Sequence, residues 1–149
     1  MMWLEPDRSD NWSRRLGGGE RCDRAFPIRD LLASGATVTL GSDWPVARCD
    51  WREGMAAAQL RRPPGFPDRE PYDDQGIDAL TALHGYTTQP ALTVRDEHRL
   101  GRVAPGHLAD ITVLAEDPVS CSPDDLVEDP IVLTVVGGEV VFRGSAIDG

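Results

Sequence analysis

The sequence contains no lysine, and all 15 of its basic residues are arginines. It therefore offers no lysine for a Schiff base and no carbamylated lysine to bridge metal ions. It has only three cysteines, Cys22, Cys49 and Cys121, and no C-x-x-C pair. An odd number at long spacings argues against a disulfide framework or a structural zinc site. We expect a protein of a reducing compartment, with the cytoplasm as its default location.

Long apolar runs and excess positive charge are also missing. No stretch approaches the 18 apolar residues of a membrane span, and the first residues lack the apolar core of a signal peptide. The formal net charge is -10, so the surface repels phosphate backbones. We therefore expect neither a membrane nor a nucleic acid as a partner. The 149 residues suffice for one ordinary domain, but not for a (β/α)8 barrel of about 250 residues.

The first two thirds of the chain predict helices around one short strand. Pro27 can open a helix that Gly35 stops, and Asp50 is a good N-cap for another. The β-branched run that follows Gly35 is typical of a buried strand. The predicted elements are a loop over 1–23, a helix over 27–34, a strand over 36–41, a helix over 51–62, a surface loop over 63–76, a helix over 77–87 and a short helix after Pro90.

From residue 100 onward the pattern changes to β structure. A strand is expected near 110–114, with Asp110 bonding backbone amides at a turn. Residues 115–130 read as a solvated, acidic connection. A hairpin with strands at 131–136 and 139–142 follows, because Gly137-Gly138 supplies the positive φ angles of a two-residue turn. The chain therefore divides into an α/β part over 24–99 and a mostly β part over 100–144.

Asp43 is the strongest candidate for a functional residue. It directly follows the predicted strand, and Pro45 cannot continue the pairing. In α/β barrels the chemistry collects at the carboxyl ends of the strands. A carboxylate there can bind a metal ion or take a proton from water. The alternative is that Asp43 is a turn former bonded to its own loop.

The neighbours of Asp43 and the three histidines are weaker candidates. Ser42 has no histidine placed to activate it, so we expect it to satisfy backbone groups. Trp44 either lines a substrate pocket or packs against the protein. His84 is expected to be packed or on the surface, and His98 and His107 are expected to be solvated in loops.

The order of these elements resembles the C-terminal end of the metal-dependent amidohydrolase superfamily. The most similar branch is its family 3, which includes N-substituted formamide deformylases, and the likeness extends over roughly residues 12–144. The stretches that carry it are Arg15-Leu16-Gly17, Arg29-Asp30-Leu31-Leu32-Ala33-Ser34-Gly35, Leu40-Gly41-Ser42-Asp43-Trp44-Pro45-Val46, Tyr86-Thr87-Thr88-Gln89-Pro90-Ala91, Leu100–Ile111 and Thr134–Val141.

The resemblance implies a fold, an activity and a site. The fold would be α/β: the last strand and helices of a (β/α)8 metallo-hydrolase barrel over 1–99, and part of a small β-sandwich domain over 100–149. The complete enzyme would use a divalent metal, zinc, to hydrolyse carbon–nitrogen bonds other than peptide bonds in a small amide-like substrate. Asp43 would contact the metal and accept a proton from the attacking water, and Trp44 would contact the substrate.

Other parts of the family's metal centre have no counterpart in the sequence. The family uses a His-x-His pair on its first strand and further ligands on middle strands, and the three histidines match none of these positions. We expect the last fifth to third of such an enzyme, inactive and without metal on its own. Met1-Met2 is an internal start, the start of a truncated gene model or that of a genuine fragment.

An alternative interpretation is a non-catalytic fragment or an interaction subunit. Such a chain would self-associate, or would need another chain to complete the barrel. The DNA upstream of Met1 would discriminate between the two. An in-frame His-x-His would indicate a complete enzyme, and a stop codon or an unrelated gene would indicate a fragment.

Overall fold

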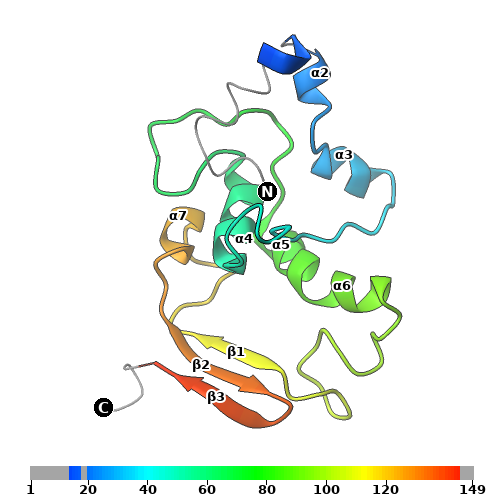
Figure 1. The fold of residues 1–149 in the computed structure, drawn as a ribbon, viewed down its shortest axis with the longest axis vertical. Coiled ribbons are helices and arrows are strands. Elements are labelled where there is room, and N and C mark those ends of the chain that lie inside the picture. Colours follow the sequence, from blue (N-terminus) through cyan, green and yellow to red (C-terminus); the bar gives the residue numbers. More distant parts are fainter. Residues whose placement is uncertain (1–13, 18–19, 145–149) are drawn as a thin grey trace.

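The computed structural model describes residues 14–17 and 20–144 (Figure 1). The expected loop over 1–23 lies partly outside these residues, at 1–13 and 18–19. Within it, Glu20–Asp23 forms the short helix α2, which the sequence pattern does not predict. No helix in the described part of the chain combines the length and the hydrophobicity that crossing a bilayer requires.

The helices beyond α2 follow the local signals of the sequence. Asp50 accepts a hydrogen bond from the amide of Arg52 at 3.0 Å, as an N-cap does, and Gly35 has the positive φ of a helix stop, 83°. The last of these helices begins two residues before Pro90 rather than after it. Proline is tolerated there because the first N–H groups of a helix have no intrahelical partner. The helices are α3 (Ile28–Ala33), α4 (Trp51–Leu60), α5 (Ala79–Tyr86) and α6 (Thr88–Thr93).

Residues 36–41 do not form the predicted strand. The segment is irregular and has no strand beside it among the described residues. The amide of Leu40 instead donates to the carbonyl of Gly85, in the last turn of α5, at 2.9 Å. A strand needs a neighbouring strand to complete its ladder, and the strands of the described part all follow residue 110. The prediction of a strand here is wrong, and a place in a barrel stays a prediction.

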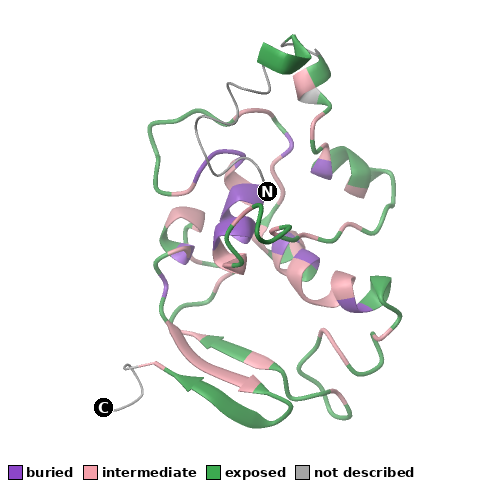
Figure 2. Ribbon diagram, in the orientation of Figure 1, coloured by how far each residue is buried: buried purple, intermediate pink, exposed green. Residues whose placement is uncertain are grey.

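The hydrophobic core lies where three helices meet. Met55 and Ala58 of α4 pack with Ala82 of α5 and with Leu126, and all four are buried. Figure 2 shows the buried residues concentrated around α4. Leu126 belongs to α7 (Pro123–Leu126), a short helix within the stretch expected to be a solvated connection. Burial of this one leucine therefore holds the connection against the helical part.

A small antiparallel sheet forms the other end of the molecule, with its strands and its hairpin near the predicted positions. Its strands β1 (Ile111–Leu114), β2 (Ile131–Val136) and β3 (Glu139–Arg143) lie in that order (Figure 1). Gly137 and Gly138 have φ angles of 57° and 86° and form the hairpin turn.

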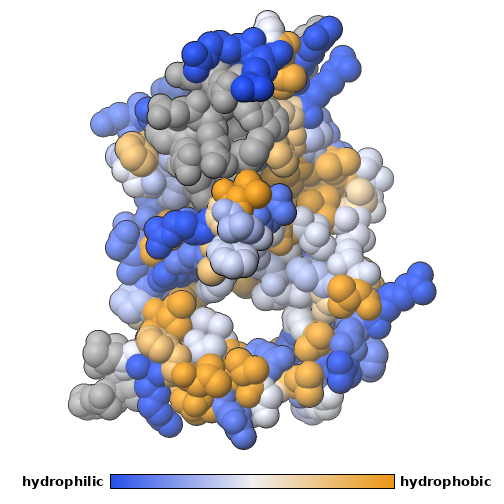
Figure 3. Space-filling model, viewed as in Figure 1, coloured by the Kyte–Doolittle hydropathy of each residue, from blue (hydrophilic) through white to orange (hydrophobic). Residues whose placement is uncertain are grey.

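A side-chain hydrogen bond fixes the turn of the hairpin, but one strand of the sheet is exposed to solvent. Asp110 accepts a hydrogen bond from the amide of Gly137 at 2.7 Å, which confirms its expected role. All five residues of β3 are exposed. Figure 3 shows apolar side chains gathered over the sheet, and a hollow between the sheet and the helical part.

Candidate functional site

Asp43 lies on an exposed loop between the irregular segment 36–40 and helix α4. Its backbone is left-handed, with φ of 53°, a conformation that aspartate adopts more readily than most residues. Its carbonyl accepts a hydrogen bond from the amide of Val46 at 2.8 Å, which closes a turn. The Trp44–Pro45 peptide bond within this turn is cis. Asp43 is exposed on this loop, and its role in binding a metal or accepting a proton stays a prediction.

The helices hold this loop on both sides. Before Asp43, the backbone is fixed to α5 by the hydrogen bond between Leu40 and Gly85. After it, the guanidinium of Arg48 lies 2.9 Å from the carboxylate of Glu53, which is buried on α4. Asp43 is thus set between two contacts with the helical part.

The start of α4 is also tied to the sheet. The guanidinium of Arg52 donates to the carboxylate of Asp50 at 2.6 and 3.0 Å and also to the carbonyl of Asp129. The buried carboxylate of Asp129 in turn accepts from the amide of Glu116, just after β1, at 3.2 Å. The hydrogen bond from Arg52 lowers the pKa of Asp50. Asp50 therefore stays ionised at neutral pH and keeps this junction intact.

The other candidates do not gather around Asp43. Trp44 is 70% exposed, and its contact with a substrate stays a prediction. His84 and His98 are exposed, as expected. His107 was expected to be solvated, and this expectation is wrong, because His107 is half-buried. Its Nδ1 is buried without a hydrogen bond, and its Nε2 lies 3.3 Å from the carbonyl oxygen of Glu97. The loop around His107 folds back on itself, and loop character alone does not reveal this.

The side chains in the described part do not by themselves fit a metal ion. Nowhere in that part do three or more histidine, cysteine, aspartate or glutamate side chains come together as a ligand group. A catalytic zinc ion takes three protein ligands, and Asp43 would supply one of them.

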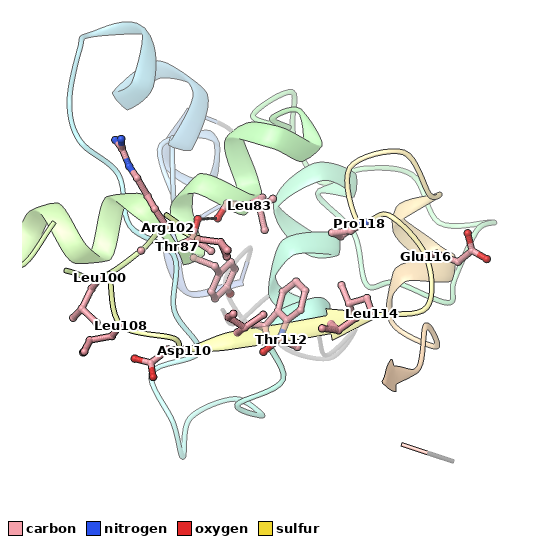
Figure 4. A pocket seen from close by; sticks show the side chains of 16 residues that line it. Leu83, Thr87, Leu100, Arg102, Leu108, Asp110, Thr112, Leu114, Glu116 and Pro118 are labelled. Carbon is pink, nitrogen blue, oxygen red and sulfur yellow. Dashed lines mark hydrogen bonds between the residues drawn. The ribbon is translucent and has the colours of Figure 1, made fainter. Parts of the chain in front are cut away.

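A cavity of about 760 Å³ lies between the helical part and β1. Trp51, Leu83 and Tyr86 line it from α4 and α5, and the whole of β1 lines it from the other side. Figure 4 shows the charged ends of Arg102 and Glu116 extending away from it. None of the residues 41–46 is in its lining. The cavity and the Asp43 loop are therefore two separate features.

Tyr86 is the residue of this cavity with a perturbed ionisation. Burial raises its pKa to about 12, and the nearby carboxylate of Asp50 adds to the shift. The phenol is therefore neutral at physiological pH. The sequence marks Tyr86 only as part of the stretch 86–91, because the cavity is assembled from segments that are far apart along the chain.

Comparison with known families gives a match over nearly the whole chain. A family model described as "Amidohydrolase family" matches residues 1–142. Similar curated proteins include an N-substituted formamide deformylase from Arthrobacter pascens, 33% identical over 80% of this chain. The putative amidohydrolase YtcJ from Bacillus subtilis (strain 168) is 30% identical over 86% of it. Protein LONG AFTER FAR-RED 3 from Arabidopsis thaliana is 30% identical over 91% of it.

The matched region is a small part of each relative. It covers 22% of the Arthrobacter protein, 24% of the Bacillus protein and 23% of the Arabidopsis protein, so this chain spans about a quarter of their length. Among solved structures, an amidohydrolase from Thermotoga maritima MSB8 superimposes with a TM-score of 0.58 at 20% identity. The superposition covers 93% of this chain and 34% of that one. The chain therefore shares the fold of part of that structure.

Proposed function

Because this chain belongs to the amidohydrolase family, we propose that it is part of a hydrolase that acts on carbon–nitrogen bonds other than peptide bonds. The substrate would be a small amide-like molecule, and the similarity to an N-substituted formamide deformylase favours N-substituted formamides as the first class to test. A cytoplasmic location agrees with the three free cysteines.

The observation that carries this proposal is the place of Asp43. The family match includes this residue. Asp43 is exposed on a loop that contacts α5 before it and α4 after it. A carboxylate in such a place can accept a proton from a water molecule that attacks the carbonyl carbon, and can return it to the leaving nitrogen. Trp44, next to it and largely exposed, offers an indole ring for the apolar part of a substrate.

The described residues do not hold the divalent metal that the resemblance implies, because they contain no group of three possible ligands. We therefore place the proposed activity in a complete enzyme. By complete enzyme we mean the protein encoded by the longest reading frame that contains residues 1–149. If this reading frame encodes no further residues, the complete enzyme is instead this chain co-expressed with the part of the Arthrobacter relative that the chain does not match.

The test compares two substrate classes in this complete enzyme. We expect turnover of an N-substituted formamide or a simple amide, and no turnover of a peptide of similar size. The chain alone is the matched control and should hydrolyse neither. Peptide hydrolysis, or no hydrolysis of any amide by a folded complete enzyme, would contradict the proposal.

A second candidate function is an interaction subunit that binds another chain. It is favoured by the sheet, because Val140, Val141 and Phe142 of β3 are all at least 45% exposed. Light scattering after size exclusion tests it. A mass above that of one chain that falls when Val141 is replaced by threonine would support this candidate, and a monomer at all concentrations would exclude self-association.

A further inference from the structure

Gly85 of α5 and Leu40, in the segment that leads to Asp43, approach each other closely. A Cβ atom added to Gly85 would lie 2.8 Å from Cγ and 3.0 Å from Cδ1 of Leu40. Ordinary contact begins at about 3.4 Å. The side chain of Leu40 therefore occupies the space that any side chain at position 85 would need.

The same two residues are joined through their backbones. The amide of Leu40 donates to the carbonyl of Gly85 at 2.9 Å. Gly85 lies in the last turn of α5, where carbonyl groups have no partner within their own helix. Among the described residues, this is the one backbone hydrogen bond made by residues 37–42. Helix α5 thus supplies the hydrogen-bond acceptor that a neighbouring strand would otherwise supply.

The contact also links the segment to the core. Leu40 packs against the cluster of Met55, Ala58, Ala82 and Leu126. Only Gly41 and Ser42 separate it from Asp43, whose own turn is closed by Val46. Because only two residues intervene, we expect a displacement of Leu40 to shift the backbone of Asp43.

We propose that Gly85 is a positioning residue for Asp43: its lack of a side chain lets Leu40 seat against α5 and so sets the place of the Asp43 carboxylate. This inference rests on the proposed function for its catalytic consequence, but its structural part stands separately. In Gly85→Ala the new Cβ would lie 2.8 Å from Cγ of Leu40, a distance that real Cβ atoms essentially never show, so Leu40 and α5 must move apart. A misplacement of about 1 Å can cost a hundredfold in rate, so we expect kcat to fall about tenfold with KM little changed.

The structural part is tested by amide hydrogen exchange on this chain. In Gly85→Ala the amide of residue 40 should exchange at least about tenfold faster than in the wild type, while the amides of α4 keep their rates. Leu40→Ala/Gly85→Ala should restore slow exchange, because Cγ and Cδ1 are gone and the remaining Cβ of residue 40 lies at an ordinary 3.6 Å. Gly41→Ala is the matched control, because an added Cβ there meets nothing within 4 Å.

The outcomes separate this inference from the proposed function. Unchanged exchange at residue 40 in a folded Gly85→Ala variant overturns it. If Gly85→Ala does not fold, the double variant must fold, and failure to do so also overturns it. Faster exchange, together with a lower kcat in the complete enzyme that the double variant rescues, supports it. Faster exchange with unchanged turnover supports the contact between Gly85 and Leu40 but overturns the proposal that Gly85 positions Asp43, and the role of Asp43 itself is then decided by Asp43→Asn.

Discussion

Arg62, just after helix α4, holds Asp124 of α7 by two parallel hydrogen bonds. Nη1 donates to Oδ1 at 3.0 Å and Nη2 donates to Oδ2 at 2.6 Å. The amide of Gly65 adds a third bond to Oδ1 at 2.8 Å. Arg62 is buried, and the Asp124 side chain is about one quarter exposed. This pair, like the burial of Leu126, fastens the acidic connection to the helical part.

Removing this carboxylate should destabilise the fold. Asp124→Asn leaves a buried guanidinium without its charged partner, which costs about 1–3 kcal/mol of unfolding free energy. Urea unfolding at pH 7 measures the loss. Asp125→Asn, at the exposed neighbouring position, is the control and should change the unfolding free energy by less than about 0.5 kcal/mol. Equal effects of the two variants would contradict the importance of this pair.

The same pair predicts a loss of stability in acid. The hydrogen bond from Arg62 lowers the pKa of Asp124 below its ordinary value. A carboxyl group whose pKa is lower in the folded state contributes stability above its unfolded pKa of about 3.9 and loses it as the pH falls through the folded value. As the pH is lowered below about 4, the urea midpoint of the wild type should therefore decrease more steeply than that of Asp124→Asn. Parallel pH curves would argue against this assignment.

Tyr86 should make the stability of the fold depend on pH in the alkaline range. Its pKa is raised to about 12 by burial, whereas an exposed tyrosine titrates near 10. The unfolded chain therefore loses the proton first, and the stability contributed by the neutral phenol is lost as the pH rises from about 10 to 12. Tyr86→Phe should lose less stability over this range in urea titrations. Parallel losses in Tyr86→Phe and the wild type over this range would contradict the assignment to Tyr86.

The hairpin turn should depend on Asp110. Its carboxylate accepts the amide of Gly137 at 2.7 Å, and a bond of this kind contributes about 1 kcal/mol. Asp110→Ala should therefore speed amide exchange in β2 and β3 while leaving α4 and α5 unchanged. Glu116→Ala, an exposed acid beyond the other end of β1, serves as the control. Unchanged exchange at Gly137 would mean that the bond is not formed in solution.

Local signals made much of the fold predictable from the sequence. Asp50 caps α4, Gly35 stops α3 and Gly137-Gly138 forms the hairpin turn, because each acts through residues within a few positions of itself. The segment 36–41 was mispredicted for the complementary reason. Its β-branched pattern is typical of a strand, but whether a strand forms depends on a neighbouring strand, which the pattern does not contain.

The features of the candidate site also differ in how far the sequence predicts them. The place of Asp43 in a loop before Pro45 follows from the local sequence. The pairing of Arg62 with Asp124, 62 positions apart, and the cavity between α5 and β1 depend on how distant segments fold together. The close approach of Leu40 to Gly85 is of the same kind.

We expect this chain, purified alone, to retain little metal. The described residues offer no group of three ligands, and a catalytic metal needs about three protein ligands to bind firmly, so less than about one tenth of an equivalent of zinc, manganese or iron should remain after dialysis. Elemental analysis measures it. A stoichiometric metal would show that ligands come together in a way the described residues do not reveal, and His84→Ala and His98→Ala would then be the first variants to test.

The most direct test of the account is the turnover of Asp43→Asn in the complete enzyme. The variant removes the proton acceptor at nearly constant volume, so kcat should fall by about a hundredfold or more while the unfolding midpoint stays the same. Asp68→Asn, in the exposed loop after α4, is the matched control and should keep wild-type turnover. Wild-type turnover in Asp43→Asn would contradict the central claim that this chain carries the proton acceptor of an amidohydrolase.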